Sequence, residues 1–368
     1  MTNIGQLKIV VFCCSGRDYV DLGAQWVNGE IGNVVFEMAS PNNLIVKDIY
    51  DRVYIEPSGN VINRADGDKL TQILEDVVDS VRLLNYTGSV GDYFDQEYPK
   101  KMIRSPLRDS PLSMEIYDWF AKELTVDDGS DSWYETSGRG YAIYDMLDGH
   151  QEWGWTSGGY HTVFDLLMKK IPNPENDLHI LDKIYLNSEV VEIVWDNLHP
   201  DLENKVLIKC RNGVTFVADH VLVTVSLGVL KATAQRMFKP VLPPQNWKTI
   251  QGLGYGTVDK IILEFPYKWW PNTSNEFALV WEPNDLCKSK ILTNNKTNMD
   301  ECWDHFVYAF NGMHNQPNVL CGWIYGAAAR YMEELSEFEV KNKVVALLQK
   351  FVGKALNTSV PSPSYFLR

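Results

Sequence analysis

The sequence lacks most of the short motifs that identify common enzyme classes. Its 368 residues contain no G-x-S-x-G, no H-E-x-x-H and no phosphate-binding P-loop. The six cysteines form no C-x-x-C pair and the seven histidines no metal-ligand spacing, so no metal site is expected. Six cysteines at this length are too few for a disulfide framework, and we expect a reducing, cytoplasmic environment.

Long hydrophobic runs are also missing. The apolar run near the N-terminus, from Ile9 to Cys14, is too short for a signal sequence or a membrane span. We interpret it as a β-strand and expect no membrane association.

Positive charge is scarce. Lys and Arg number 34 against 48 Asp and Glu, a net charge of −14. Such a surface repels nucleic acid and attracts cations, so it indicates either simple solubility or a polycationic partner. Aromatic residues are plentiful by contrast, with 12 Trp, 18 Tyr and 14 Phe, and aromatic side chains line pockets for flat rings and for cations. The sequence gives no indication of the oligomeric state.

The order of predicted elements indicates two interleaved domains, one α/β and one α+β. Apolar spacing predicts helices over 69–84 and 113–124. Strands are expected over 183–196, 205–210, 214–219 and 220–225, and a turn into a short helix over 227–232. The segment 127–158 is irregular and rich in Gly, Ser and aromatic residues, as segments that line sites often are.

Three segments carry the most information about chemistry. The first, residues 21–33, contains Gly23, where the main chain can approach a flat ligand, and the aromatic ring of Trp26. The second, residues 222–232, runs from an apolar strand through Ser226 into a helix. The third, residues 238–271, places Lys260 among apolar neighbours. Taken alone, that lysine is expected to extend its ammonium to solvent, although a partly buried, chemically active ammonium is the alternative.

A glycine cluster in the third segment, GLGYG at 252–256, is interpreted as a turn. A dinucleotide-binding glycine loop must open a helix, and this cluster is followed by a strand.

Together with SGGY at 157–160 and residues 319–340, these three segments resemble the flavin-dependent amine oxidases, closest to polyamine and spermine oxidases. The resemblance implies an FAD-linked amine oxidase fold, α/β plus α+β, in which a flavin-binding domain is interleaved with a substrate domain built on a mixed sheet. The flavin domain would comprise residues 1–49 and 145–253, and the substrate domain residues 50–144 and 254–368.

The resemblance also implies roles for individual residues. Lys260 matches the lysine that holds a water near flavin N5, and Asn28 matches a position close to the substrate. The remaining matches are expected to bind the cofactor: Gly23, Ala24, Gln25 and Trp26 against the flavin, Val190 against the adenine, and Ser226 where many members have proline.

The implied activity is FAD-dependent oxidation of a polyamine, with spermine, spermidine or an acetylated form giving an aldehyde, an amine and hydrogen peroxide. The flavin carries the redox chemistry and the protein orients it. Two alternatives remain open. One is a non-catalytic relative or fragment that binds polyamine or a partner protein, and the other is a histone-lysine demethylase-like amine oxidase.

The sequence departs from the family pattern at three places. No G-x-G-x-x-G unit precedes Ile4, and the chain stops at Arg368, before the family's late flavin-contacting segment. We therefore expect the N-terminal Rossmann unit and the C-terminal flavin segment to be missing, and flavin binding by this chain alone to be weak. Asn28 stands where several relatives carry His or Glu, so that contact becomes neutral.

Overall fold

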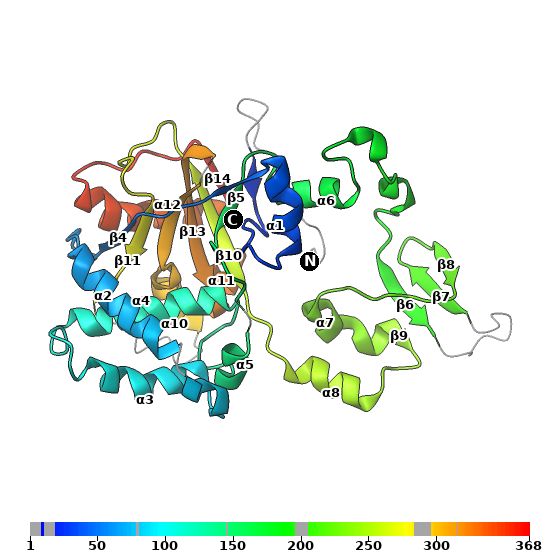
Figure 1. Ribbon diagram of the computed structural model, residues 1–368, viewed down its shortest axis with the longest axis horizontal. Coiled ribbons are helices and arrows are strands. Elements are labelled where there is room, and N and C mark those ends of the chain that lie inside the picture. The colour runs from blue at the N-terminus through cyan, green and yellow to red at the C-terminus, as the bar shows by residue number, and fades with distance from the viewer. Residues whose placement is uncertain are drawn as a thin grey trace. The chain divides into compact units, whose positions relative to one another are not determined.

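The computed structural model describes residues 9–10, 19–78, 81–144, 146–195, 205–282, 296–313 and 315–368. The chain divides into two compact units (Figure 1). The larger unit comprises Val10–Tyr160 and Gly256–Arg368, and the smaller unit Met1–Ile9 and His161–Tyr255. The expected boundary after residue 253 falls close to the observed one. Residues 10–49 and 145–160 instead share a unit with the large sheet. Which unit serves the flavin stays a prediction.

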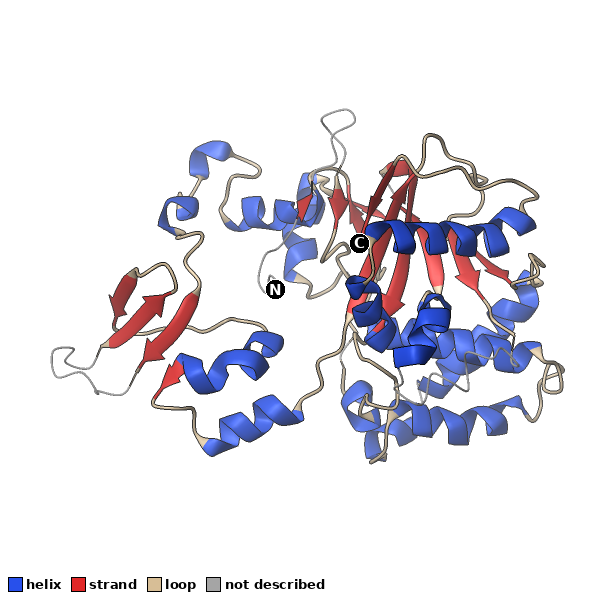
Figure 2. Cartoon of the chain, turned by 180° about the vertical axis from the view of Figure 1, so that it is seen from behind, coloured by secondary structure: helices blue, strands red, loops and turns tan. Residues whose placement is uncertain are grey.

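The larger unit is built on a six-stranded sheet with strand order β14-β10-β13-β12-β11-β4. Neighbouring strands are antiparallel except β4 and β11, which run parallel. Figure 2 shows the strands of this sheet in red with helices packed around them. Its strands are β4 (Arg52–Ile55), β10 (Val258–Glu264), β11 (Glu276–Leu279), β12 (Ala309–Met313), β13 (Gln316–Tyr325) and β14 (Tyr365–Leu367).

Strand β10, which lies between β14 and β13, is buried on both faces. Ile261 and Leu263 belong to the main hydrophobic core on one face, whereas Ile262 packs with Val20 and Cys321 on the other. Because side chains alternate along a strand, Lys260 lies on the same face as Ile262. This is why a lysine at that position becomes enclosed.

Helices pack against the sheet through apolar stripes. In α2 (Arg64–Val78), Leu70, Leu74 and Val77 repeat at helical spacing and are fully buried. This helix packs against α3 (Val90–Met102), which begins at a capping box, and α4 (Leu112–Asp127). The predicted helix over 69–84 therefore exists but is shifted toward the N-terminus, and the one over 113–124 is confirmed.

The other helices of this unit are α1 (Val34–Ala39), α5 (Gly138–Ala142), α10 (Lys296–Cys302), α11 (Gly326–Glu334) and α12 (Glu337–Leu348). Short strands β1 (Ile9–Val10) and β2 (Val20–Asp21) also pair with each other.

A two-stranded ribbon brings three distant segments together. Strand β3 (Ile45–Lys47) pairs antiparallel with β5 (Trp153–Trp155), and the ladder extends by a hydrogen bond of 2.8 Å from Asp48 N to Glu152 O. Trp153 forms an isolated bridge with Val27. The pairing thus places Trp26, Asp48 and Glu152 next to one another.

The smaller unit has a four-stranded sheet of order β8-β7-β6-β9, built from β6 (Val190–Val194), β7 (Val206–Cys210), β8 (Thr215–Ala218) and β9 (Phe238–Lys239). Its helices are α6 (Thr162–Leu167), α7 (Leu227–Met237) and α8 (Pro244–Gly252). Ile193, Met237 and Ile250 form its core. The glycine cluster at 252–256 ends α8 and leads into β10, as expected of a turn.

One predicted strand of this unit is wrong. Residues 220–225 take no strand conformation, and Leu222 is 89% exposed. The reason is that no described strand pairs with them, and a strand needs a neighbour to satisfy its N–H and C=O groups.

No helix in the described ranges is long and apolar enough to cross a membrane. Cys210 and Cys321 are free and buried, as expected for reduced cysteines, but Cys302 is disulfide-bonded, against that expectation.

Candidate functional site

The ammonium of Lys260 is buried against the turn formed by residues 21–25. Its Nζ donates hydrogen bonds to Asp21 O at 2.8 Å, Gly23 O at 2.9 Å and Gln25 Oε1 at 2.9 Å. An ammonium has three donor hydrogens, so all are used. The residue is 8% exposed, and burial lowers the pKa of Lys260 while Asp21 opposes that shift. The expectation that this lysine reaches solvent is therefore wrong, because the turn encloses it.

Two stacked indoles lie beside this ammonium. Trp26 and Trp323 have ring centroids 5.6 Å apart and planes inclined by 25°. Lys260 Nζ lies 5.0 Å from the Trp323 centroid and 5.9 Å from that of Trp26, within range of a cation–π attraction. The indole of Trp26 is fixed by a hydrogen bond of 3.2 Å to Asp48 Oδ2, which also accepts one of 2.8 Å from Tyr50 Oη.

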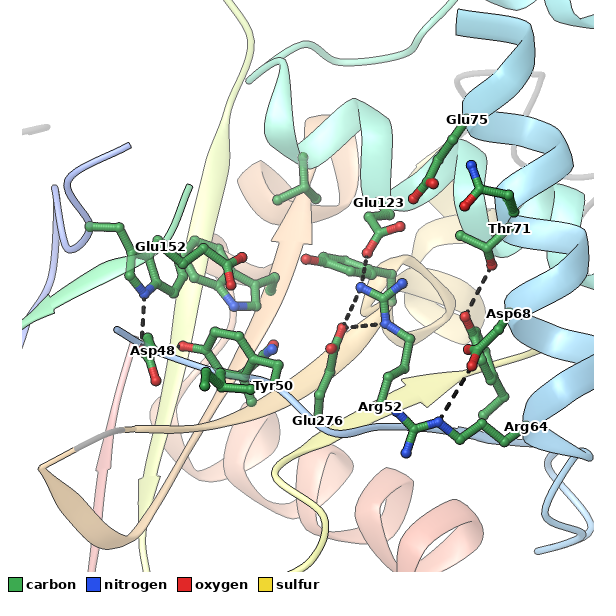
Figure 3. Close-up of a pocket in the computed structure, with 18 of the residues that line it drawn as sticks. Asp48, Tyr50, Arg52, Arg64, Asp68, Thr71, Glu75, Glu123, Glu152 and Glu276 are labelled. Carbon is green, nitrogen blue, oxygen red and sulfur yellow. Dashed lines mark hydrogen bonds and ion pairs between the residues drawn. The ribbon is translucent and has the colours of Figure 1, made fainter. Parts of the chain in front are cut away.

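The indole pair forms part of the wall of a cavity of about 520 Å³ (Figure 3). Carboxylates dominate its polar lining: Asp48, Asp68, Glu75, Glu123, Glu152 and Glu276. Aromatic rings supply much of the rest: Trp26, Tyr50, Tyr54, Tyr308 and Trp323. Two cations, Arg52 and Arg64, also line it. Such a cavity suits a positively charged ligand with an apolar chain.

One carboxyl of the cavity is poised to change charge near neutral pH. Burial, then the nearby carboxyls of Glu276 and Asp48, raise the pKa of Glu152 to about 7, and Arg52 opposes the shift. Glu152 lies at the same end of the cavity as Asp48 (Figure 3). A cation bound there would favour the ionised carboxylate.

Comparison with known proteins identifies the family. The family model for flavin containing amine oxidoreductases matches residues 14–368. The chain belongs to this family.

Two curated relatives match about half of this chain. The bovine peroxisomal N(1)-acetyl-spermine/spermidine oxidase is 32% identical over 165 residues, 44% of this chain and 31% of the relative. The human protein of that name is 31% identical over 198 residues, 51% of this chain and 36% of the relative. The matched segments thus span about a third of each relative's length.

The fold is that of the flavin amine oxidases as well. Cyclohexylamine oxidase from Brevibacterium oxydans superposes with a TM-score of 0.59 at 19% identity, covering 95% of this chain and 73% of that one. At this identity the likeness concerns the fold alone. The mixed sheets agree with the α/β plus α+β amine oxidase fold inferred from the sequence.

Gly23 and Ala24, which are expected to lie against the flavin ring, have an exposed main chain. A Cβ added to Gly23 would meet no atom within 4 Å, and Gly23 and Ala24 are exposed. A flat ring can therefore approach this edge of the main chain closely, which fits FAD. Gln25 is held by Lys260, and Trp26 by Asp48. The expected water on Lys260 has no donor left to bind it, so that role stays a prediction.

The other predicted site residues are not among those that line the cavity. Asn28 is exposed and donates a hydrogen bond of 2.7 Å to Gln151 O. In the smaller unit, Val190 begins β6, and Ser226 caps α7 by accepting a hydrogen bond of 3.3 Å from Val229 N. Their roles toward substrate and adenine stay predictions. The described residues hold no cluster of His, Cys, Asp and Glu fit for a metal.

The irregular segment 127–158 contributes less to the cavity than its composition indicates. Of its described residues, only His150 and Glu152 line the cavity. Trp133 and Tyr134 line a second cavity of about 430 Å³ instead. The residues that sequence reasoning missed, above all Arg52, Glu276 and Trp323, reach the cavity through strand register, for which the sequence holds no local signal.

Proposed function

We propose that this protein oxidises polyamines with FAD as cofactor, and that the cavity of about 520 Å³ is its amine-binding site. The observation that carries the proposal is the junction of two features. The buried ammonium of Lys260 binds the carbonyl of Gly23, where the main chain is open, and it lies beside the two indoles that line the carboxylate-rich cavity. The names of the curated relatives support a polyamine as substrate.

Each group has a task in this proposal. FAD, when bound, supplies the electron acceptor for the oxidation. Lys260 fixes the turn at 21–25 and so the edge against which a ring would lie. The carboxylates attract the ammonium groups of the amine, and the indoles of Trp26 and Trp323 contact its apolar chain and its charge.

The carboxyl of Glu152 is suited to hold a proton from the bound amine. An amine must lose its ammonium proton before a hydride can leave the neighbouring carbon. A carboxylate whose pKa is raised to about 7 accepts that proton more readily than an ordinary glutamate.

The test uses the purified protein with added FAD. Because flavin binding by this chain alone is expected to be weak, FAD is supplied in excess. We then expect part of the flavin absorbance to stay with the protein after desalting, and hydrogen peroxide to appear when spermine, spermidine or an acetylated spermidine is added. Aromatic monoamines serve as controls. Retained flavin without peroxide from any polyamine would contradict the substrate assignment. Polyamine binding without retained flavin would instead support a binding protein that lacks oxidase activity.

A further inference from the structure

The second cavity, of about 430 Å³, lies within the larger unit. The described residues that line it are all different from those of the carboxylate-rich cavity. Much of its wall consists of aromatic rings and one thioether: Trp133, Tyr134, Met299, Phe306 and Tyr325. A cavity of this volume with apolar walls and a few polar groups is typical of a site for a small molecule.

The ammonium of Lys122, on α4, is buried in this wall with N–H donors to spare. The residue is 8% exposed and lines the cavity. Among the residues that the structure describes, its ion-pair partner is Asp118, with Oδ2 at 3.1 Å from Nζ. An ammonium has three N–H donors, so one carboxylate oxygen leaves two of them for another acceptor.

The hydroxyl of Tyr325, at the end of β13, is a second buried donor of this cavity. The residue is also 8% exposed, and its hydroxyl has no hydrogen-bond partner within the described ranges. Burial, and then the nearby carboxylate of Asp118, raise the pKa of Tyr325, so the hydroxyl keeps its proton. Because buried polar groups are nearly always hydrogen-bonded, such a donor beside a cavity indicates a ligand that carries an acceptor.

The charged groups of the cavity compensate one another. Lys122 is paired with Asp118. Arg330 donates two hydrogen bonds to Asp131, and Glu135 is exposed. An anionic ligand would therefore find no unpaired cation, and a cationic ligand would offer no acceptor to the buried donors. An uncharged acceptor, such as the carbonyl oxygen of an amide, meets neither obstacle.

We propose that this cavity is a second ligand site, which binds an uncharged aromatic amide through its carbonyl oxygen. Trp133 and Phe306 contact the ring of the ligand, and Lys122 and Tyr325 donate hydrogen bonds to the oxygen, which has two lone pairs. The site has no part in the proposed oxidation of polyamines, so either assignment can fail without the other.

Three probes of nearly equal size separate the effects of ligand charge. Benzamide is neutral and carries the carbonyl, benzoate is its anionic analogue, and benzamidinium is a cationic analogue that lacks an acceptor. NMR titration of the full chain with each probe gives the dissociation constants. We expect benzamide to bind at least about tenfold more tightly than either of the other two. Spermidine should not displace it.

Two variants locate the probe in this cavity. Tyr325→Phe removes one donor and keeps the ring, so the affinity for benzamide should fall about three- to tenfold, as expected for one hydrogen bond. Lys122→Met should weaken benzamide binding at least as much, and it should improve binding of benzamidinium, which can then pair with Asp118. Should Lys122→Met fail to fold, Tyr325→Phe alone decides.

Tyr267→Phe is the matched control, since Tyr267 is exposed and is not among the residues that line this cavity. Its affinity for benzamide should equal that of the wild type. Absence of benzamide binding, equal affinity for the three probes, or unchanged benzamide affinity in Tyr325→Phe would overturn the inference. Each of those results would leave the proposed amine oxidation standing.

Discussion

Lys260 and Trp323 are direct cross-strand partners in the pairing of β10 with β13, and the lysine Nζ lies 5.0 Å from the indole centroid. The register of one strand pair thus places a buried ammonium beside an aromatic face. The same ammonium holds the turn at residues 21–25 through three hydrogen bonds. Lys260 therefore stabilises the fold, in addition to being a candidate catalytic residue.

Replacing Lys260 with Met should destabilise the fold. The change leaves the buried carbonyl oxygen of Asp21 and the partly buried one of Gly23 without their donor, so we expect the free energy of unfolding to fall by about 2 kcal/mol. Urea denaturation measures the change. Lys69→Met, at an exposed position of α2, is the matched control and should have little effect. Equal stability of both variants would show that the three hydrogen bonds contribute nothing net.

Glu152 should make stability depend on pH. Because its folded-state pKa, about 7, lies above the ordinary value of 4.5, the folded state binds the proton more tightly. This contribution is fully present below pH 4.5 and is lost as the pH rises through 7, with a total of about 3 kcal/mol. Glu152→Gln should remove that part of the slope between pH 4.5 and 7.5 in urea titrations. Parallel pH profiles of the two proteins would refute the assignment.

Replacing Gly23 with valine should weaken cofactor binding without affecting the stability of the fold. An added Cβ meets no atom within 4 Å and the residue is exposed, so Gly23→Val should leave the melting temperature nearly unchanged. The valine side chain would occupy the space in front of the main-chain edge. We therefore expect flavin retention after desalting to be lost. Undiminished retention in this variant would place the flavin elsewhere.

The cap of α7 offers a test in the smaller unit. Ser226 accepts a hydrogen bond from Val229 N at the first turn of that helix. Ser226→Ala should lower the free energy of unfolding by about 1 kcal/mol, whereas Ser226→Asp preserves an N-cap acceptor and should retain stability. If both variants lose the same amount in denaturant titrations, Ser226 stabilises the protein by some means other than capping.

The sequence predicts where many helices and strands lie, but it does not predict which segments pair with one another. The approach of Lys260 to the turn containing Trp26 follows from the resemblance of both segments to one family, and the structure brings them together. Residues 220–225 look like a strand because their apolar, β-branched side chains suit one, yet no described strand pairs with them. Propensity describes a segment, whereas pairing depends on what lies beside it.

The cavity could not be derived from the sequence for the same reason. Arg52 and Glu276 meet across 224 positions because two strands happen to align in one register. A shift of one residue would turn both side chains to other faces. Neither the spacing nor the composition near either residue indicates that alignment.

The parallel ladder between β4 and β11 also has a consequence for biosynthesis. Because the chain leaves the ribosome from its N-terminus, β4 is exposed long before its neighbour β11 has been translated. Closing so long a loop is slow, and until it closes the arginine on β4 lacks the glutamate that follows 224 positions later. The core around β4 therefore forms only after residue 276 has been translated. In nascent chains halted before that point, β4 should be open to chaperone binding and to proteolytic cleavage.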